Sequence, residues 1–321
     1  MVDVLCLGES MALFVPAEDG PPDQVRTWTR TVGGAESNVA CHLVGLGVTS
    51  AWVSAVGDDA FGRAVVDFVA GHGVDVSGVR VDPDRPTGLY VKESDAAGSP
   101  VRYYRSGSAA AGLGPALLAD LPLDGVRVVH TSGITAGLSD GCLALMRALL
   151  AAKRTHLLSF DLNWRPALWA DRDPGVLREL AALADLVLVG ADEAETVWGT
   201  REPAEIRAVL PEPASLVVKQ AELGATLIER DPATGADRAP VFQPALRVDV
   251  VEPVGAGDAF AAGYLAATLA GAPPKRRLRA GHVQAAAVLR TRDDVAPPLP
   301  PDLVACLLDA DESGWTGAYI S

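Results

Sequence analysis

The chain has 321 residues, 49% of them hydrophobic, with 27 basic and 41 acidic side chains and a formal net charge of -14. This size and apolar content suit a globular α/β protein with a large core and exclude a disordered or fibrous chain. The acidic excess argues against nucleic-acid and membrane partners. Four scattered cysteines without a Cys-x-x-Cys pair, and no signal or membrane-spanning run, predict a cytoplasmic protein.

The first half of the chain alternates between strand and helix patterns. We expect buried strands over residues 2–7 and 50–56, each followed by a helix, over 33–47 and from about 61 to 73; such βαβ units build a parallel sheet. Residues 10–32 and 87–105 differ, because they hold short alternating strands around turns, the second turn at 95–98. These two excursions predict a small antiparallel sheet outside the main one.

The second half continues the α/β pattern. Strands are expected over 126–133, 156–160, 186–189 and 216–219, with a hairpin partner at 224–228. Helices are expected over 140–152, 280–289 and 303–308. A strand-like segment over 247–251 then leads into a glycine turn, and an alanine-rich helix follows that turn.

This glycine turn, Gly255-Ala256-Gly257-Asp258, is the strongest chemical signal in the chain. Glycines let backbone amides approach a ligand, and the first amides of a helix favour an anion such as phosphate. A carboxylate in the same turn would repel phosphate unless it takes a proton from an attacking hydroxyl, which makes Asp258 a candidate base. The alternative is a plain turn with an aspartate that stabilises the helix start.

Candidate ligand-binding side chains lie elsewhere in the chain. Gly33, Gly34 and Asn38 open a helix, although Asn38 could equally bond local backbone. Tyr90, Tyr103 and Arg105 alternate along the second excursion, so they bind a small polar ligand or form an exposed face with a salt-bridged arginine. A further group follows strands at the sheet edge, where α/β sheets bind ligands: Asp161, Asn163, Arg165, Asp192, Glu193 and Glu195. The last three either stabilise a helix start or hold hydrated Mg²⁺.

Together these features indicate transfer of phosphate to a hydroxyl, without a Walker-type or protein-kinase motif. The chain resembles the ribokinase-like, PfkB-type carbohydrate kinases in two signatures, residues 33–40 and 254–260. The resemblance implies a three-layer α/β/α fold with a mostly parallel sheet, a core of residues 1–10, 33–85 and 109–321, and a β-sheet lid of residues 11–32 and 86–108. It also implies ATP and Mg²⁺, with Asp258 as the base and the Ala256 and Gly257 amides as the anion hole.

Within that family the chain is most similar to the 2-keto-3-deoxygluconate kinases, which implies a sugar acid held by Gly34, Tyr90, Tyr103, Arg105 and Arg165. Two arginines also give a reason to expect a ligand with a carboxylate, whereas a neutral sugar would not need them. The resemblance places the nucleotide at Lys219, Gly224, Gly255, Ala256, Gly257 and His282, and assigns Glu195 to the metal through water. Fructokinase, ribokinase, 5-keto-2-deoxygluconate kinase and a catalytically silent sugar-acid-binding protein are the alternatives.

Two further expectations concern cations and assembly. Glu252-Pro253 stands where the family usually has Asp-Thr, which argues against a monovalent-cation site of the usual kind and leaves K⁺ open. Leu13, Phe14 and Trp28 on the lid sheet predict a homodimer that pairs through the lid.

Overall fold

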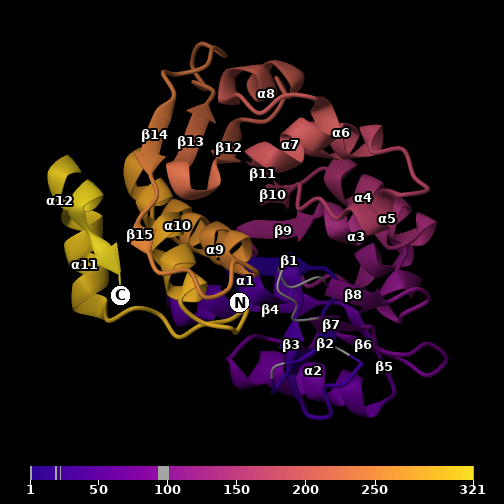
Figure 1. Cartoon of the computed structure of the whole chain (residues 1–321). Coiled ribbons are helices and arrows are strands. Elements are labelled where there is room, and N and C mark those ends of the chain that lie inside the picture. Colours follow the sequence, from indigo (N-terminus) through magenta and orange to yellow (C-terminus); the bar gives the residue numbers. More distant parts are fainter. Residues whose placement is uncertain (1, 19, 22, 93–100, 321) are drawn as a thin grey trace.

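The computed structural model describes residues 2–18, 20–21, 23–92 and 101–320 and shows a central sheet between helical layers, with a smaller sheet at one end (Figure 1). The central sheet has eight strands. In spatial order they are β14 (Val241–Pro244), β13 (Gly224–Glu229), β12 (Ser215–Lys219), β11 (Leu186–Gly190), β10 (Leu157–Asp161), β9 (Val128–Ser132), β1 (Val4–Leu7) and β4 (Ser50–Val53). All neighbours are parallel except β12–β13 and β13–β14, which confirms the mostly parallel sheet.

Helices cover both faces of this sheet because its strands are apolar on both sides. Leu5 and Leu7 of β1 face one core cluster and Val4 and Cys6 face the other, as the period of two requires. The first cluster is covered by α4 (Asp140–Ala151), α6 (Gly175–Ala182), α7 (Ala191–Trp198) and α8 (Pro203–Val209). The second is covered by α1 (Ala35–Gly45), α2 (Ala60–Gly71), α9 (Ala256–Leu269) and α10 (Pro274–Leu289). The predicted α/β/α layering is confirmed.

Short elements complete the core. They are β5 (Ala55–Gly57), β6 (Arg80–Asp82), α3 (Gly133–Gly137), α5 (Pro166–Trp169), β15 (Arg247–Val248), α11 (Pro301–Asp309), α12 (Glu312–Gly317) and β16 (Tyr319–Ile320). The predicted strand over 50–56 is split at Ser54 into β4 and β5, and β5 pairs with β6. No helix among the described residues is long and apolar enough to cross a membrane.

The predictions were wrong at two boundaries. The strand expected over 247–251 is only β15, which pairs with β16, and Val250 and Val251 are exposed. Helix α10 begins at Pro274, not near residue 280, because its basic first turns find partners that a hydrophobic pattern does not reveal. Arg277, for example, bonds Glu229 of β13 with both carboxylate oxygens, at 2.9 and 2.8 Å.

The smaller sheet, here called the lid, contains β3 (Trp28–Gly33), β2 (Met11–Pro16), β7 (Leu89–Lys92) and β8 (Val101–Tyr104) in that order. The two predicted excursions each form an antiparallel pair, and the pairs join in parallel between β2 and β7. The turn expected at 95–98 lies outside the described residues.

The lid buries much of the apolar surface on which the dimer prediction rested. Leu13 is fully buried, and the ring of Phe14 packs edge-on against Phe61 of α2 with centroids 5.6 Å apart. Trp28, the third residue, is half-buried, and its indole nitrogen donates to the backbone oxygen of Val25 at 3.2 Å. The lid dimer therefore stays a prediction with less surface to support it.

Candidate active site

Two cavities meet where the carboxyl ends of β10, β11 and β12 face the start of α9. The lid cavity, of about 450 Å³, is closed on one side by Met11, Tyr90 and Tyr103 of the lid. The helix cavity, of about 860 Å³, lies against α9 and α10. The wall between them is shared by four residues: Glu193, Lys219, Pro253 and Gly257. Two ligands in these cavities would therefore meet at the first turn of α9.

The glycine turn positions that first turn. Gly255 precedes α9 with a φ of 86°, in the left-handed region that favours glycine, and a Cβ there would lie 2.9 Å from the backbone oxygen of Asp294. At Gly257 a Cβ would meet only the Lys219 ammonium, at 3.6 Å, because this position faces the cavities. The Ala256 amide donates to the backbone oxygen of Pro253 at 3.3 Å, whereas Gly257 lies on the walls of both cavities. The start of α9 therefore lies at the junction of the two cavities, where helix amides can bind an anion.

Asp258 lies at the same junction, on the wall of the lid cavity. The Asn38 side-chain amide donates a 2.9 Å hydrogen bond to its Oδ2, so the two predicted residues are brought together. Burial raises the pKa of Asp258 to about 7, with help from the charges of Asp161 and Asp294 and against the bond from Asn38 and the charge of Arg165. A carboxylate with a pKa near neutrality can accept a proton from a hydroxyl and release it again.

The lid contributes the predicted aromatic and cationic face. Tyr90 and Tyr103 are cross-strand partners whose rings stack with centroids 5.5 Å apart, and Arg105 lies 5.3 Å from the Tyr103 ring centre. Arg105 is buried, however, and its Nε donates to Glu9 at 2.6 Å. Glu9 therefore pairs with the guanidinium that was expected to bind a ligand carboxylate, although Arg105 also lines the lid cavity. This partner, 96 residues away, was not recognised in the sequence.

Arg165 is the more available cation of the lid cavity. It lines the cavity together with Asn163, which adopts a φ of 43°, and with Gly33 and Gly34. Its Nη1 donates to the backbone oxygen of Trp164 at 2.9 Å, and among the described residues it has no carboxylate partner. It can therefore pair with an anionic group on a ligand.

Lys219 and Asp161 form an ion pair on the shared wall. The ammonium donates to both oxygens of Asp161, at 3.0 and 2.8 Å, and the side chains are 19% and 3% exposed. Lys219 thus brings a positive charge next to Gly257 without leaving a buried charge unpaired. Lys219 lines both cavities, including the helix cavity where the nucleotide was expected, and its contact with the nucleotide stays a prediction.

Gly224 and His282 lie in the helix cavity, where the nucleotide was expected. A Cβ at Gly224 would lie 2.3 Å from the backbone oxygen of Gln243, so this glycine permits a close backbone approach. His282 Nε2 lies 3.1 Å from the same oxygen, and burial lowers the pKa of His282 to about 4, so the ring is neutral and bonded to the protein. Exposed Val250 and Tyr319 add apolar surface to this cavity.

Comparison with known proteins identifies the family of this chain. The family model of the pfkB family carbohydrate kinases matches residues 1–301 of this chain. The 2-dehydro-3-deoxygluconokinases of Bacillus subtilis and Thermoproteus tenax are 36% and 34% identical, each over 92% of this chain and over 91% and 90% of their own. The chain belongs to the PfkB family of carbohydrate kinases. A PfkB protein from Polaromonas sp. JS666 has the same fold, with a TM-score of 0.80 and 31% identity over 90% of this chain and 96% of that one.

Membership of the PfkB family establishes the class of reaction. The chain is a phosphotransferase with an alcohol group as acceptor, as the glycine turn and Asp258 predicted. The ribokinase-like fold is likewise confirmed. The roles of individual site residues rest on the geometry above.

One acidic residue of this PfkB kinase is not where the sequence interpretation put it. Glu195 has a side chain that is 55% exposed, faces Arg201 at 3.6 Å, and lines neither cavity. Glu193 lines both; its carboxylate accepts the backbone amides of Gly190 and Trp164, at 2.7 and 2.9 Å, and burial raises its pKa. Residues two apart on a helix point about 200° apart, so only one of these glutamates can face the site.

Glu193 is also the better candidate to face a metal ion. No three His, Cys, Asp or Glu side chains among the described residues are grouped so that they could hold a metal by themselves. Mg²⁺ keeps several waters and is commonly bound by one or two carboxylates together with substrate phosphates, and Glu193 on the shared wall fits that arrangement.

Proposed function

We propose that the chain transfers the γ-phosphate of ATP to the terminal hydroxyl of 2-keto-3-deoxygluconate, the sugar acid also called 2-dehydro-3-deoxygluconate, and forms its 6-phosphate. The observation that carries the proposal is Asp258 at the junction of two cavities, with a pKa raised to about 7. The names of the relatives at 36% and 34% identity support the choice of acceptor. We further propose a cytoplasmic location and keep the homodimer as a prediction.

The acceptor would occupy the lid cavity, with its carboxylate paired to Arg165 and its hydroxyls bonded by Asn163, Tyr90 and Tyr103. In this scheme Arg105 acts mainly by positioning the cavity wall, because its charge is paired with Glu9 and its guanidinium lies 5.3 Å from the Tyr103 ring centre. The specificity for a sugar acid then depends on one arginine rather than two.

Asp258 would take the proton of the terminal hydroxyl while Asn38 holds its carboxylate in place. ATP would bind in the helix cavity, with its base near Val250 and His282 and its phosphates toward Lys219. The amides at the start of α9 and the Lys219 ammonium would stabilise the negative charge on the transferred group. Mg²⁺ would supply further positive charge at the phosphates, and Glu193 would hold it through water.

The test is an assay of ADP release over a panel of acceptors: 2-keto-3-deoxygluconate, its C4 epimer, fructose, ribose and 5-keto-2-deoxygluconate. We expect the highest kcat/KM with 2-keto-3-deoxygluconate. Preference for a neutral sugar would overturn the acceptor and favour fructokinase or ribokinase activity. Binding of sugar acid without any ADP release would favour a catalytically silent binding protein.

Arg165→Gln sharpens this test. The variant should raise KM for the sugar acid at least tenfold and leave KM for a weak neutral acceptor unchanged, because only the acid has a carboxylate to lose. Arg172→Gln is the matched control, since Arg172 pairs with exposed Asp140 at 2.9 Å outside both cavities. Equal losses with both classes of acceptor would contradict the role given to Arg165.

A further inference from the structure

A buried lysine of the lid lies close to the loop that precedes α9, residues 252–255. Lys92 ends β7, and its side chain is only 4% exposed. The ammonium lies 3.1 Å from Asp294 Oδ1 and 3.8 Å from Glu252 Oε2, whose side chains are 3% and 13% exposed. One lid residue therefore bridges two carboxylates that belong to separate segments of the core.

Glu252 and Asp294 both contact the loop over residues 252–255, the first through its carboxylate and the second through its backbone. Glu252 Oε1 accepts the backbone amide of Val254 at 3.2 Å. The backbone of Asp294 packs so closely on Gly255 that a Cβ there would lie 2.9 Å from its oxygen and 3.0 Å from its Cα. Any shift of Asp294 or Glu252 would thus move the loop that sets the first amides of α9.

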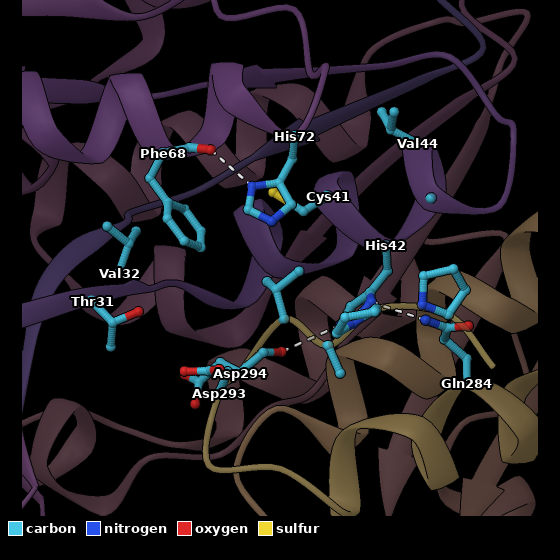
Figure 2. A pocket seen from close by; sticks show the side chains of 15 residues that line it. Thr31, Val32, Cys41, His42, Val44, Phe68, His72, Gln284, Asp293 and Asp294 are labelled. Carbon is cyan, nitrogen blue, oxygen red and sulfur yellow. Dashed lines mark hydrogen bonds between the residues drawn. The ribbon is translucent and has the colours of Figure 1, made fainter.

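The backbone of Asp294 is also held by His42 of α1, which in turn contacts Gln284 of α10, as the dashed lines in Figure 2 show. The Gln284 amide lies 3.0 Å from His42 Nδ1, and His42 Nε2 lies 3.3 Å from the backbone oxygen of Asp294. If Gln284 donates to Nδ1, then Nε2 carries the proton and donates to Asp294, and the ring is neutral because burial lowers its pKa to about 4. The Asp294 backbone is therefore anchored to the core, and its carboxylate is left to the lid residues Lys92 and Tyr90, the latter at 3.0 Å.

We propose that Lys92 is the resident cation of this loop: its ammonium neutralises Glu252 and Asp294 and aligns the start of α9 when the lid covers the acceptor. Lys92 acts through the loop and is a positioning residue. Two buried carboxylates this close would otherwise repel each other and lose their hydration without compensation. Lid placement and the geometry of the anion site are thereby coupled.

The same contacts bear on the monovalent cation that the sequence left open. A K⁺ ion seeking the Glu252 carboxylate would compete with an ammonium that already lies beside it and beside Asp294. The residues present therefore do not fit an additional monovalent cation at these carboxylates, and phosphotransfer needs no monovalent cation from solution. This inference rests on phosphotransfer at this site and not on the identity of the acceptor.

The experiment compares the whole protein with Lys92→Ala and with Lys153→Met, a control at an exposed lysine. Turnover is measured with the best acceptor of the panel in choline, potassium and methylammonium chloride at equal ionic strength. Wild type and the control should give the same kcat in all three salts within about twofold. Because a misplacement of about 1 Å can lower a reaction rate roughly a hundredfold, the kcat of Lys92→Ala in choline should be ten- to hundredfold below that of the wild type. Methylammonium or potassium should raise the kcat of Lys92→Ala severalfold above its value in choline, since either cation can enter the space beside the two carboxylates.

Thermal unfolding in the same salts provides a readout that does not depend on activity. Potassium should raise the Tm of Lys92→Ala relative to choline and leave that of the wild type unchanged. A wild type that requires potassium, a folded Lys92→Ala with normal kcat, or one that no cation rescues would each overturn the proposal. If Lys92→Ala does not fold, the wild-type comparison in choline and potassium decides, and absence of turnover with every acceptor would instead count against the proposed function.

Discussion

Replacing Asp258 by Asn removes the proposed base while it keeps the shape of the side chain. The Asn38 amide, which donates to Asp258 Oδ2 at 2.9 Å, can donate to the oxygen of the new amide in the same way. The substitution therefore separates the charge of Asp258 from its packing. We expect kcat to fall by orders of magnitude and the fold to be stabilised.

The sign of the stability change follows from the pKa of this group. Burial raises it from 3.8 to about 7, so the folded protein binds a proton more tightly than the unfolded chain does. The free energy of unfolding contributed by Asp258 therefore falls as the pH rises from about 4 through 7. Three pKa units correspond to about 4 kcal/mol, and the position of Asp258 on a cavity wall reduces this, so D258N should gain roughly 1 to 2 kcal/mol at pH 8.

Urea unfolding at pH 5 and pH 8, together with initial rates of ADP release, measures both effects. The gain in stability should be larger at pH 8 than at pH 5. Asp302→Asn is the matched control, because Asp302 is exposed in the first turn of α11 and its loss should cost roughly 0.3 to 1 kcal/mol. A D258N protein that is less stable than wild type at pH 8, or that turns over at a near-normal rate, would refute the reasoning.

Three further predictions follow from the site. In wild type, kcat/KM should rise with pH through about 7 as Asp258 loses its proton, and a flat profile from pH 6 to 8 would contradict this group as the base. Glu193→Gln should raise the Mg²⁺ concentration needed for half-maximal rate about tenfold, whereas Glu195→Gln, on the exposed face of α7, should leave it unchanged. Burial lowers to about 4 the pKa of three histidines: His42, His130 and His282. As the pH drops from about 6.5 to 4, only the unfolded chain binds protons at these three side chains, so their contribution to the free energy of unfolding should fall, and in D258N, which lacks the opposing contribution of Asp258, urea titration should show this fall.

The parts of the fold that were predictable from the sequence are those that local patterns encode. Continuous apolar runs marked the buried strands β1, β9 and β11, since parallel strands covered on both faces need no polar side. The glycine turn marked the start of α9, because it combines backbone freedom with a carboxylate at a helix N-terminus. Both signals lie within a few residues of the feature that they predict.

The parts that could not be predicted depend on contacts between distant segments. Whether Arg105 is paired could not be decided from the sequence because its partner Glu9 lies 96 residues earlier, and Lys92 and Asp294 meet across 202 residues. The choice between Glu193 and Glu195 depends on which face of α7 is turned to the sheet edge. One local signal did favour Glu193. It lies three residues after the last residue of β11, and a side chain at this position can accept the backbone amide at the strand end.

The pair between Arg105 and Glu9 also bears on how fast products leave. It joins lid to core with side chains that are 8% and 1% exposed, so dissolved salt can scarcely screen it. Any outward swing of the lid that separates the pair must hydrate both charges before the lid cavity opens fully. The residence time of the phosphorylated product should accordingly respond to temperature far more than to ionic strength.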